Sequence, residues 1–142
     1  MGTIFYKEGI RATGDDGVNW ELAVIDNHTT AELRINVVGT ENYNFLKFAN
    51  LLEFDKFANA ILKNKQTVSN AIDYKGNCYE VWRSADFLGF VCRNICSAKE
   101  QNIIFINKKE FYDFKDGIKI LQDKFEPLID KQLSWSFVMI YI

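Results

Sequence analysis

Proline, histidine and cysteine are scarce in this chain, which holds one proline, one histidine and three cysteines. A single histidine leaves little material for acid–base catalysis or for a histidine-rich metal site. An odd number of cysteines, without the spacing of a disulfide-rich secreted scaffold, is typical of a reducing compartment. We therefore expect a cytoplasmic location, in keeping with an N-terminus that has no basic segment followed by a long apolar run.

A surplus of charge of one sign is also missing, because the formal net charge is -2 and the isoelectric point is near 5.4. This balance excludes a global basic field of the kind that attracts nucleic acids or anionic lipids, so any polyanion site must be a local patch. The most apolar stretch, residues 137–142, is far shorter than the roughly 20 residues of a membrane-spanning helix. We interpret it as a last strand and expect no membrane partner.

The motifs of common catalytic classes are missing as well. The chain has no G-x-x-x-x-G-K-[ST], G-x-G-x-x-G or G-x-S-x-G, which disfavours nucleotide hydrolysis and hydride transfer. His28 stands among turn-forming residues, where a solvated histidine is a simpler interpretation than a general base. Cys92 and Cys96, with Cys78 nearby, are one ligand short of a zinc site, and buried free cysteines are the simpler interpretation. The sequence predicts no catalytic residue, no metal site, no cofactor and no enzymatic activity.

Apolar and aromatic residues are plentiful, at 48% and 15% of the 142 residues, which favours one shared core. An internal repeat runs through them at one constant offset. Residues 48–57 recur as residues 105–114, and Ile61 recurs as Ile118. Carried upstream without a gap, the same offset matches further apolar positions: Leu22 with Tyr79, Val24 with Val81, Leu33 with Phe90, and Ile35 with Cys92.

The repeated segment predicts the start of a helix in each half. Asn50 and Asn107 can each act as an N-cap, and Glu53 and Glu110 stand three residues later, as in a capping box. Apolar residues then recur at helical spacing, and the second helix should stop by Pro127. The competing interpretation is that two amphipathic helices share a common cap by chance.

Alternating apolar and polar residues predict four strands before each helix. We expect them near residues 4–11, 20–24, 33–37 and 43–48, and again near 68–74, 79–83, 87–95 and 102–105. The predicted fold class is α+β, a tandem duplication of a ββββα module whose antiparallel sheets pack with two helices as an intramolecular pseudo-dimer. The modules would span residues 1–66 and 67–130 of one compact domain, and residues 131–142 would form a C-terminal strand or tail.

This pattern resembles the PUR-domain and Whirly groups of single-stranded nucleic-acid-binding proteins, whose unit of four antiparallel strands and a helix is used in pairs. The resemblance is architectural and covers residues 1 to about 126. In the second half, residues 79–83 and 87–93 are similar to the paired central strands of PUR repeats, and the helix that opens at Asn107 also fits.

The resemblance implies that basic and aromatic residues on the strand face away from the helices hold the nucleic acid. Alternation sends Leu33 and Ile35 inward, which leaves Arg34 on the outward phase. In the second half, Trp82, Phe87 and Arg93 fall on that phase. Arginine can pair with phosphate and stack on bases, and an exposed tryptophan offers a π-face to a base. We predict Arg34, Trp82, Phe87 and Arg93 as nucleic-acid-binding residues.

Two functions follow, and the sequence does not separate them. The first is a non-enzymatic binder of single-stranded DNA or RNA, with a regulatory role as one option. The alternative is a small protein-interaction module, such as an inhibitor, immunity or regulatory protein, that binds through its sheet or its C-terminal tail. Glu32 and Glu80 on or near the outward surface would repel phosphate and so favour the alternative. A homodimer stays open in both.

Overall fold

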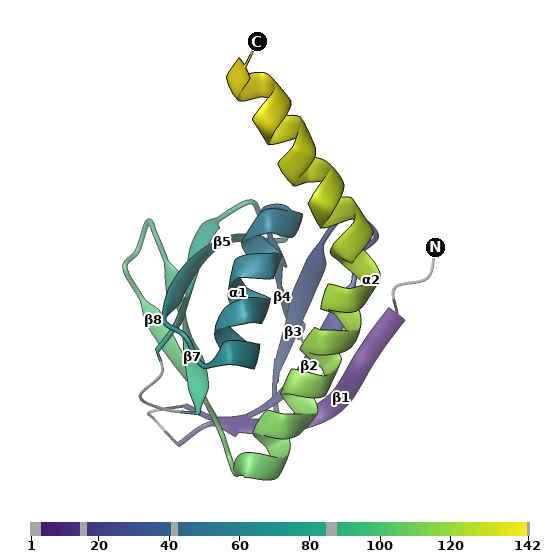
Figure 1. Cartoon of the computed structure of the whole chain (residues 1–142). Coiled ribbons are helices and arrows are strands. Elements are labelled where there is room, and N and C mark those ends of the chain that lie inside the picture. Colours follow the sequence, from purple (N-terminus) through teal and green to yellow (C-terminus); the bar gives the residue numbers. More distant parts are fainter. Residues whose placement is uncertain (1–3, 15–16, 41–42, 85–87, 142) are drawn as a thin grey trace.

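The computed structural model of the chain describes residues 4–14, 17–40, 43–84 and 88–141. Four strands and a helix are followed by four more strands and a longer helix (Figure 1). The first half consists of β1 (Ile4–Thr13), β2 (Asn19–Asp26), β3 (Ala31–Val37), β4 (Tyr43–Phe48) and α1 (Leu51–Lys63). The second half consists of β5 (Thr67–Asp73), β6 (Cys78–Arg83), β7 (Gly89–Asn94), β8 (Glu100–Phe105) and α2 (Lys108–Tyr141).

The eight strands form one closed antiparallel barrel in the order β1 to β8, so the predicted pseudo-dimer of two ββββα modules, with antiparallel sheets packed against two helices, is wrong. The two halves join through β4 and β5, where Leu46, Lys47 and Phe48 pair with Asp73, Ile72 and Ala71. They join again through β1 and β8, where Ala12 pairs with Phe105 and Thr13 with Ile104. Each half-sheet therefore continues into the other half.

The barrel closes because edge strands need hydrogen-bond partners for their backbone groups. Alternation tells which face of a strand is buried, but it does not tell which strand lies beside an edge. Two separate four-stranded sheets would leave four edges with unpaired N–H and C=O groups, whereas closure removes edges. The barrel pairs the outer strands of each half with those of the other.

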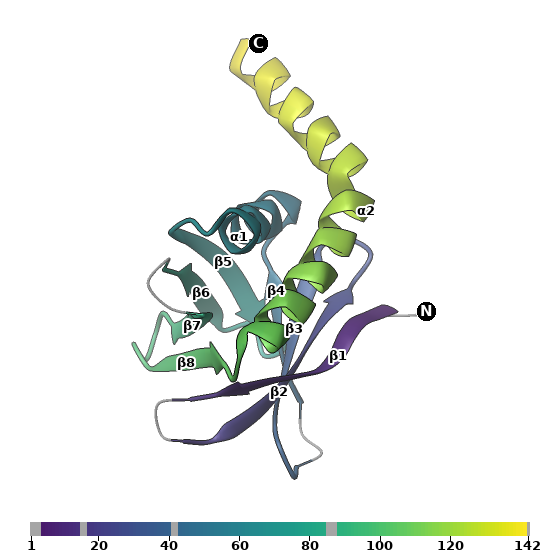
Figure 2. The ribbon, with the colours of Figure 1, turned by 60° about the horizontal axis from the view of Figure 1, so that its bottom comes forward.

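The two helices lie side by side within the concave curve of the sheet (Figure 2). Their apolar faces and the inward positions of the strands make one core, in which Phe54, Phe57, Phe90 and Phe114 are fully buried. The rings of Phe57 and Phe90 meet edge to face with centroids 5.5 Å apart. The helices therefore fill the barrel at this level as its central packing layer.

The predicted N-caps are confirmed. The glutamates of the predicted capping boxes, which were expected to reach back to the cap residues, bind elsewhere. The backbone N–H of Glu53 donates to Asn50 Oδ1, and that of Glu110 donates to Asn107 Oδ1, both at 2.9 Å. The glutamate carboxylates bind the first strand of the opposite half instead. Glu53 Oε1 accepts from the Asn70 side-chain amide at 2.7 Å, and Glu110 Oε2 accepts from the Arg11 backbone N–H at 3.0 Å. Each helix start thus helps to close the barrel.

The end of α2 differs from the prediction, because the helix passes through Pro127 and continues to Tyr141, where a strand was expected. Proline inside a helix removes one hydrogen bond and tends to kink the helix rather than always end it. Phe125 and Ile129 are buried on either side of Pro127, so core packing holds the helix together there. Beyond this region α2 changes direction and projects away from the barrel (Figures 1 and 2).

Candidate functional site

Three of the four sequence-predicted binding residues lie on the outer wall of the barrel. Arg34 is on β3, Trp82 on β6 and Arg93 on β7, each beside inward-facing residues that are buried. Trp82 has 39% of its surface exposed. Phe87 lies outside the described residues.

The barrel does not bring these residues together into one site. Strands β4 and β5 stand between Arg34 and Trp82, so the two are three strand spacings apart across the wall, about 14 Å. They are also offset along the strands, because Arg34 pairs with Phe45 whereas Trp82 pairs with Val68 at the start of β5. Trp82 and Arg93 are closer, because Trp82 pairs with Val91 and Glu80 pairs with Arg93 on the neighbouring strands. The predicted set therefore divides into Arg34 on one side and Trp82 with Arg93 on another.

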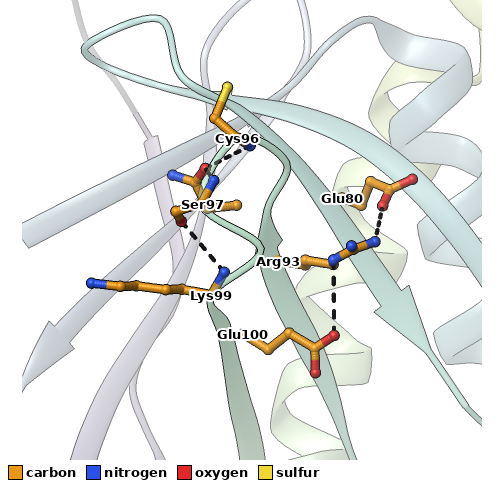
Figure 3. A network of polar contacts seen from close by, with 7 residues as sticks. Glu80, Arg93, Cys96, Ser97, Lys99 and Glu100 are labelled. Atoms are coloured by element: carbon orange, nitrogen blue, oxygen red, sulfur yellow. Dashed lines mark hydrogen bonds and ion pairs between the residues drawn. The ribbon is translucent and has the colours of Figure 1, made fainter.

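Arg93 is flanked by two carboxylates in the ladder (Figure 3). Its Nη1 lies 3.4 Å from Glu80 Oε1, and its Nε lies 3.9 Å from Glu100 Oε1. Both glutamates are register partners of Arg93. Exposed ion pairs of this kind contribute only about 0.2–1 kcal/mol to stability. The row of Glu80, Arg93 and Glu100 has a formal charge of -1, which disfavours the approach of a phosphate.

A groove on the other side of the outer wall combines aromatic and basic side chains. A continuous register row crosses it from Ile25 on β2 to Glu32 on β3, Lys47 on β4 and Ile72 on β5. Phe45 of β4 and Tyr74, just beyond β5, also line this groove, which has a volume of about 350 Å³. We name this site the β2–β5 groove.

The two carboxylates at the β2–β5 groove are engaged in local hydrogen bonds. Glu32 Oε1 accepts from the Asn27 side-chain amide. Asp73 holds the β5–β6 hairpin by accepting from the backbone N–H groups of Lys75 and Asn77, both at 2.9 Å. Burial raises the pKa of Asp73, but hydrogen bonds from the Asn77 side chain and the turn amides outweigh it and leave the pKa lowered. The Asp73 carboxylate therefore stays ionised and stabilises the β5–β6 turn.

Lys47 lines the groove, and two further cations, Arg34 and Lys75, lie next to its aromatic residues. Arg34 pairs directly with Phe45 across β3 and β4, so this predicted residue borders the groove. Lys47 lies in the register row, and the Nζ of Lys75 lies 5.7 Å from the centroid of the Tyr74 ring. Tyr74 is 72% exposed. This arrangement can stack a flat aromatic group and place one or two anionic oxygens beside lysine or arginine.

Sequence reasoning missed Phe45, Lys47 and Tyr74. The signal was present on β4, where Phe45 and Lys47 alternate with the inward Asn44 and Leu46. What the sequence could not give was Tyr74, because the pairing of β4 with β5 crosses from one half of the repeat to the other.

The other candidates for chemistry have structural environments. His28 is exposed in the β2–β3 turn with φ of 69°, and its backbone N–H donates to Asp26 Oδ1 at 2.7 Å. Burial raises the pKa of Cys92 to about 12, which keeps this thiol protonated and unreactive at neutral pH. Cys78 and Cys96 are free and exposed. Within the described ranges, no three or more histidine, cysteine or acidic side chains are grouped as metal ligands.

In the part of the chain that the structure describes, no helix has the length and apolar character needed to cross a membrane. Comparison of the chain with protein-family models, curated proteins and solved structures gave no match.

Proposed function

We propose that this protein binds single-stranded nucleic acid through the β2–β5 groove, without catalysis. The observation that carries the proposal is the pair of aromatic side chains, Phe45 and Tyr74, in one groove with Lys47. Stacking on such residues contributes about 1–3 kcal/mol per base and tolerates any sequence. We also propose a cytoplasmic location, because Cys78 and Cys96 carry exposed free thiols that a reducing compartment preserves.

The small net charge of the groove limits the electrostatic part of the binding affinity and therefore its salt dependence. Arg34, Lys47 and Lys75 stand against Glu32 and Asp73, so the formal local balance is only one positive charge. Stacking must therefore supply most of the affinity. With one or two phosphates neutralised, binding should weaken by only about three- to sevenfold between about 50 and 200 mM salt.

Fluorescence anisotropy with a labelled, mixed-sequence oligonucleotide, as DNA and as RNA, tests the proposal. Tyr74→Ala should weaken binding by about fivefold or more, in line with the loss of one stacked base. Tyr112→Ala is the matched control, because Tyr112 is an exposed tyrosine on α2, away from the groove. No binding at low salt, or equal binding by both variants, would show that the proposal is wrong.

A second candidate function, docking of a protein partner, is favoured by the outer face of β5 to β7. Trp82 and Ile95 are exposed on the β6 and β7 side of this face, and the carboxylates around Arg93 disfavour a phosphate chain. The same titration with Trp82→Ala separates the two candidates. If this variant binds oligonucleotide as the unaltered protein does, Trp82 is free to serve a protein partner. If it loses binding, the nucleic acid lies on β6 and β7 instead.

A further inference from the structure

The inner wall of the barrel changes from apolar to polar toward the end that carries the β5–β6 and β7–β8 hairpins. In each of three strands, the inward position nearest this end is an amide side chain. The inward series are Phe48, Leu46 and Asn44 on β4, Phe90, Cys92 and Asn94 on β7, and Phe105, Ile103 and Gln101 on β8. This repeated change defines a polar mouth above an apolar floor.

A pocket of about 480 Å³ opens at this mouth, in the size range of small-molecule sites. Its floor is made by Ile35, Leu46 and Cys92, all nearly fully buried. The register places Ile35 beside Asn44 and Cys92 beside Gln101, so floor and rim belong to the same ladders. Every lining residue comes from the strands and their hairpins, and none comes from either helix.

The polar groups at the rim are available to a ligand. Among the described residues, none forms a hydrogen bond with the side chains of Asn44, Gln101 or Tyr79. Asn94 is different, because its Oδ1 accepts from the backbone N–H groups of Cys96 and Ser97 at 3.0 and 3.1 Å and so holds the β7–β8 turn. Amides and a phenol offer donors and acceptors together, so they suit a neutral molecule with both.

The charges at the mouth disfavour an anionic ligand. Lys99 is the one cation that lines the described pocket, and it stands against Asp73, which holds the β5–β6 turn, and Glu100, which pairs with Arg93, so there is no surplus of positive charge to hold an anion. The Cys92 thiol on the floor is protonated, so the floor itself is neutral and apolar. The complementary ligand is therefore uncharged, with a flat apolar face for the floor and a hydrogen-bonding edge for the rim.

We propose that the mouth of the barrel binds an uncharged heterocycle of nucleoside size, stacked on Ile35, Leu46 and Cys92 and held at its edge by Asn44, Tyr79 and Gln101. This site is on the inner wall, whereas the β2–β5 groove is on the outer wall. The proposal therefore does not depend on the proposed nucleic-acid function.

Calorimetric titration of the full chain with adenosine and with uridine tests the proposal, with AMP and indole as comparison probes. At least one nucleoside should bind saturably, AMP should bind more weakly because of its charge, and indole should bind more weakly because it has a single donor. Gln101→Leu and Asn44→Leu should each weaken nucleoside binding by about tenfold, the loss expected for one good hydrogen bond to a buried edge.

Gln66→Leu is the matched control, because Gln66 is an exposed amide in the turn after α1 and should leave nucleoside binding unchanged. Circular dichroism melting of each variant separates lost binding from lost folding. The proposal is overturned if neither nucleoside binds, if indole binds as well as they do, or if Gln101→Leu has no effect on a folded protein. It is also overturned if Tyr74→Ala removes nucleoside binding, because the ligand would then lie in the outer groove. Gln101→Leu should not change oligonucleotide binding, so the two proposals fail independently.

Discussion

The two halves of the chain build the same aromatic contact and then use it in different surroundings. The rings of Phe48 and Phe57 have centroids 5.1 Å apart, and their equivalents Phe105 and Phe114 have centroids 5.0 Å apart. The sequence repeat thus has a structural counterpart in each half. What differs is the set of neighbours that the rest of the fold brings to each copy.

The first difference is at Phe54 and its equivalent Phe111. Phe54 is fully buried and meets the ring of Phe125 edge to face at 6.1 Å, between the sheet and α2. Phe111 is 7% exposed, and the Arg83 guanidinium lies 5.7 Å from its ring centroid. Phe54 therefore lies in the middle of the core and Phe111 at its margin. The sequence repeat reproduces the local contacts of the two residues, but it does not give them the same depth of burial.

The second difference is at Asp26 and Arg83, equivalent positions at the ends of β2 and β6, both only 1% exposed. Asp26 binds the ammonium of Lys124 on α2. Arg83 donates to the side chain of Asn64, the left-handed residue that ends α1, at 2.9 Å. Opposite charges thus perform one task, which is to fasten a strand end to a helix.

The largest difference in stability between the two halves is expected when equivalent core phenylalanines are replaced. Phe54→Ala should lower the free energy of unfolding by about 4 kcal/mol, because it leaves a cavity in the centre of the core. Phe111→Ala should cost less, about 2–3 kcal/mol, because the margin can relax and admit water. Urea denaturation measures both, and equal losses would contradict the difference in depth.

A smaller effect, with a pH signature, is expected at Asp26. Burial raises the pKa of Asp26, but the hydrogen bonds from Lys124 and from the backbone of His28 outweigh it, so the pKa is lowered in the folded state. Its contribution is therefore present above the unfolded pKa and is lost as the pH falls through the folded pKa. Asp26→Asn should cost about 1–3 kcal/mol at pH near 7.

Urea denaturation of both proteins between about pH 7 and pH 3 checks the sign of this effect, since an ordinary aspartate titrates near pH 4. The difference in stability between the two proteins should shrink as the solution becomes acidic. A difference that stays constant over this range would mean that ionisation of Asp26 does not support the fold.

The hydrogen bonds from each helix start to a strand of the opposite half should each make a modest contribution to stability, similar in the two halves. Glu53→Ala and Glu110→Ala each remove an acceptor for a strand of the opposite half, worth about 0.5–1.5 kcal/mol. Hydrogen exchange at the amides of Asn70 and Arg11 should speed up, each only in its own variant. Faster exchange throughout the barrel in either variant would instead indicate global loss of stability.

The smallest effect is expected from shortening α2. Among the residues whose side chains the structure describes, Ile129 is the last in the buried core, so a chain that ends at Asp130 keeps every one of those core side chains. The free energy of unfolding should change by no more than about 0.5 kcal/mol, as for other surface changes. A loss of several kcal/mol in urea denaturation would show that the projecting end of the helix stabilises the barrel.

The predicted binding set shows where sequence reasoning about the site stops. Alternation assigned Arg34, Trp82 and Arg93 to the outward phase, because side-chain direction along a strand has a period of two. It could not show that β4 and β5 separate Arg34 from the other two, or that Glu80 and Glu100 flank Arg93. Those neighbours come from strand order and register, which depend on pairing between distant segments.

The features that follow from the sequence alone are local ones. The Asn50 and Asn107 caps, the helices after them and the inward phenylalanines follow from hydrogen bonding and periodicity within a few residues. Tertiary structure alone decided that the half-sheets close into one barrel and that α2 continues through Pro127. The reason is that edge pairing and core packing are satisfied by segments far apart in the chain, and their free energy outweighs the local preference of a single residue.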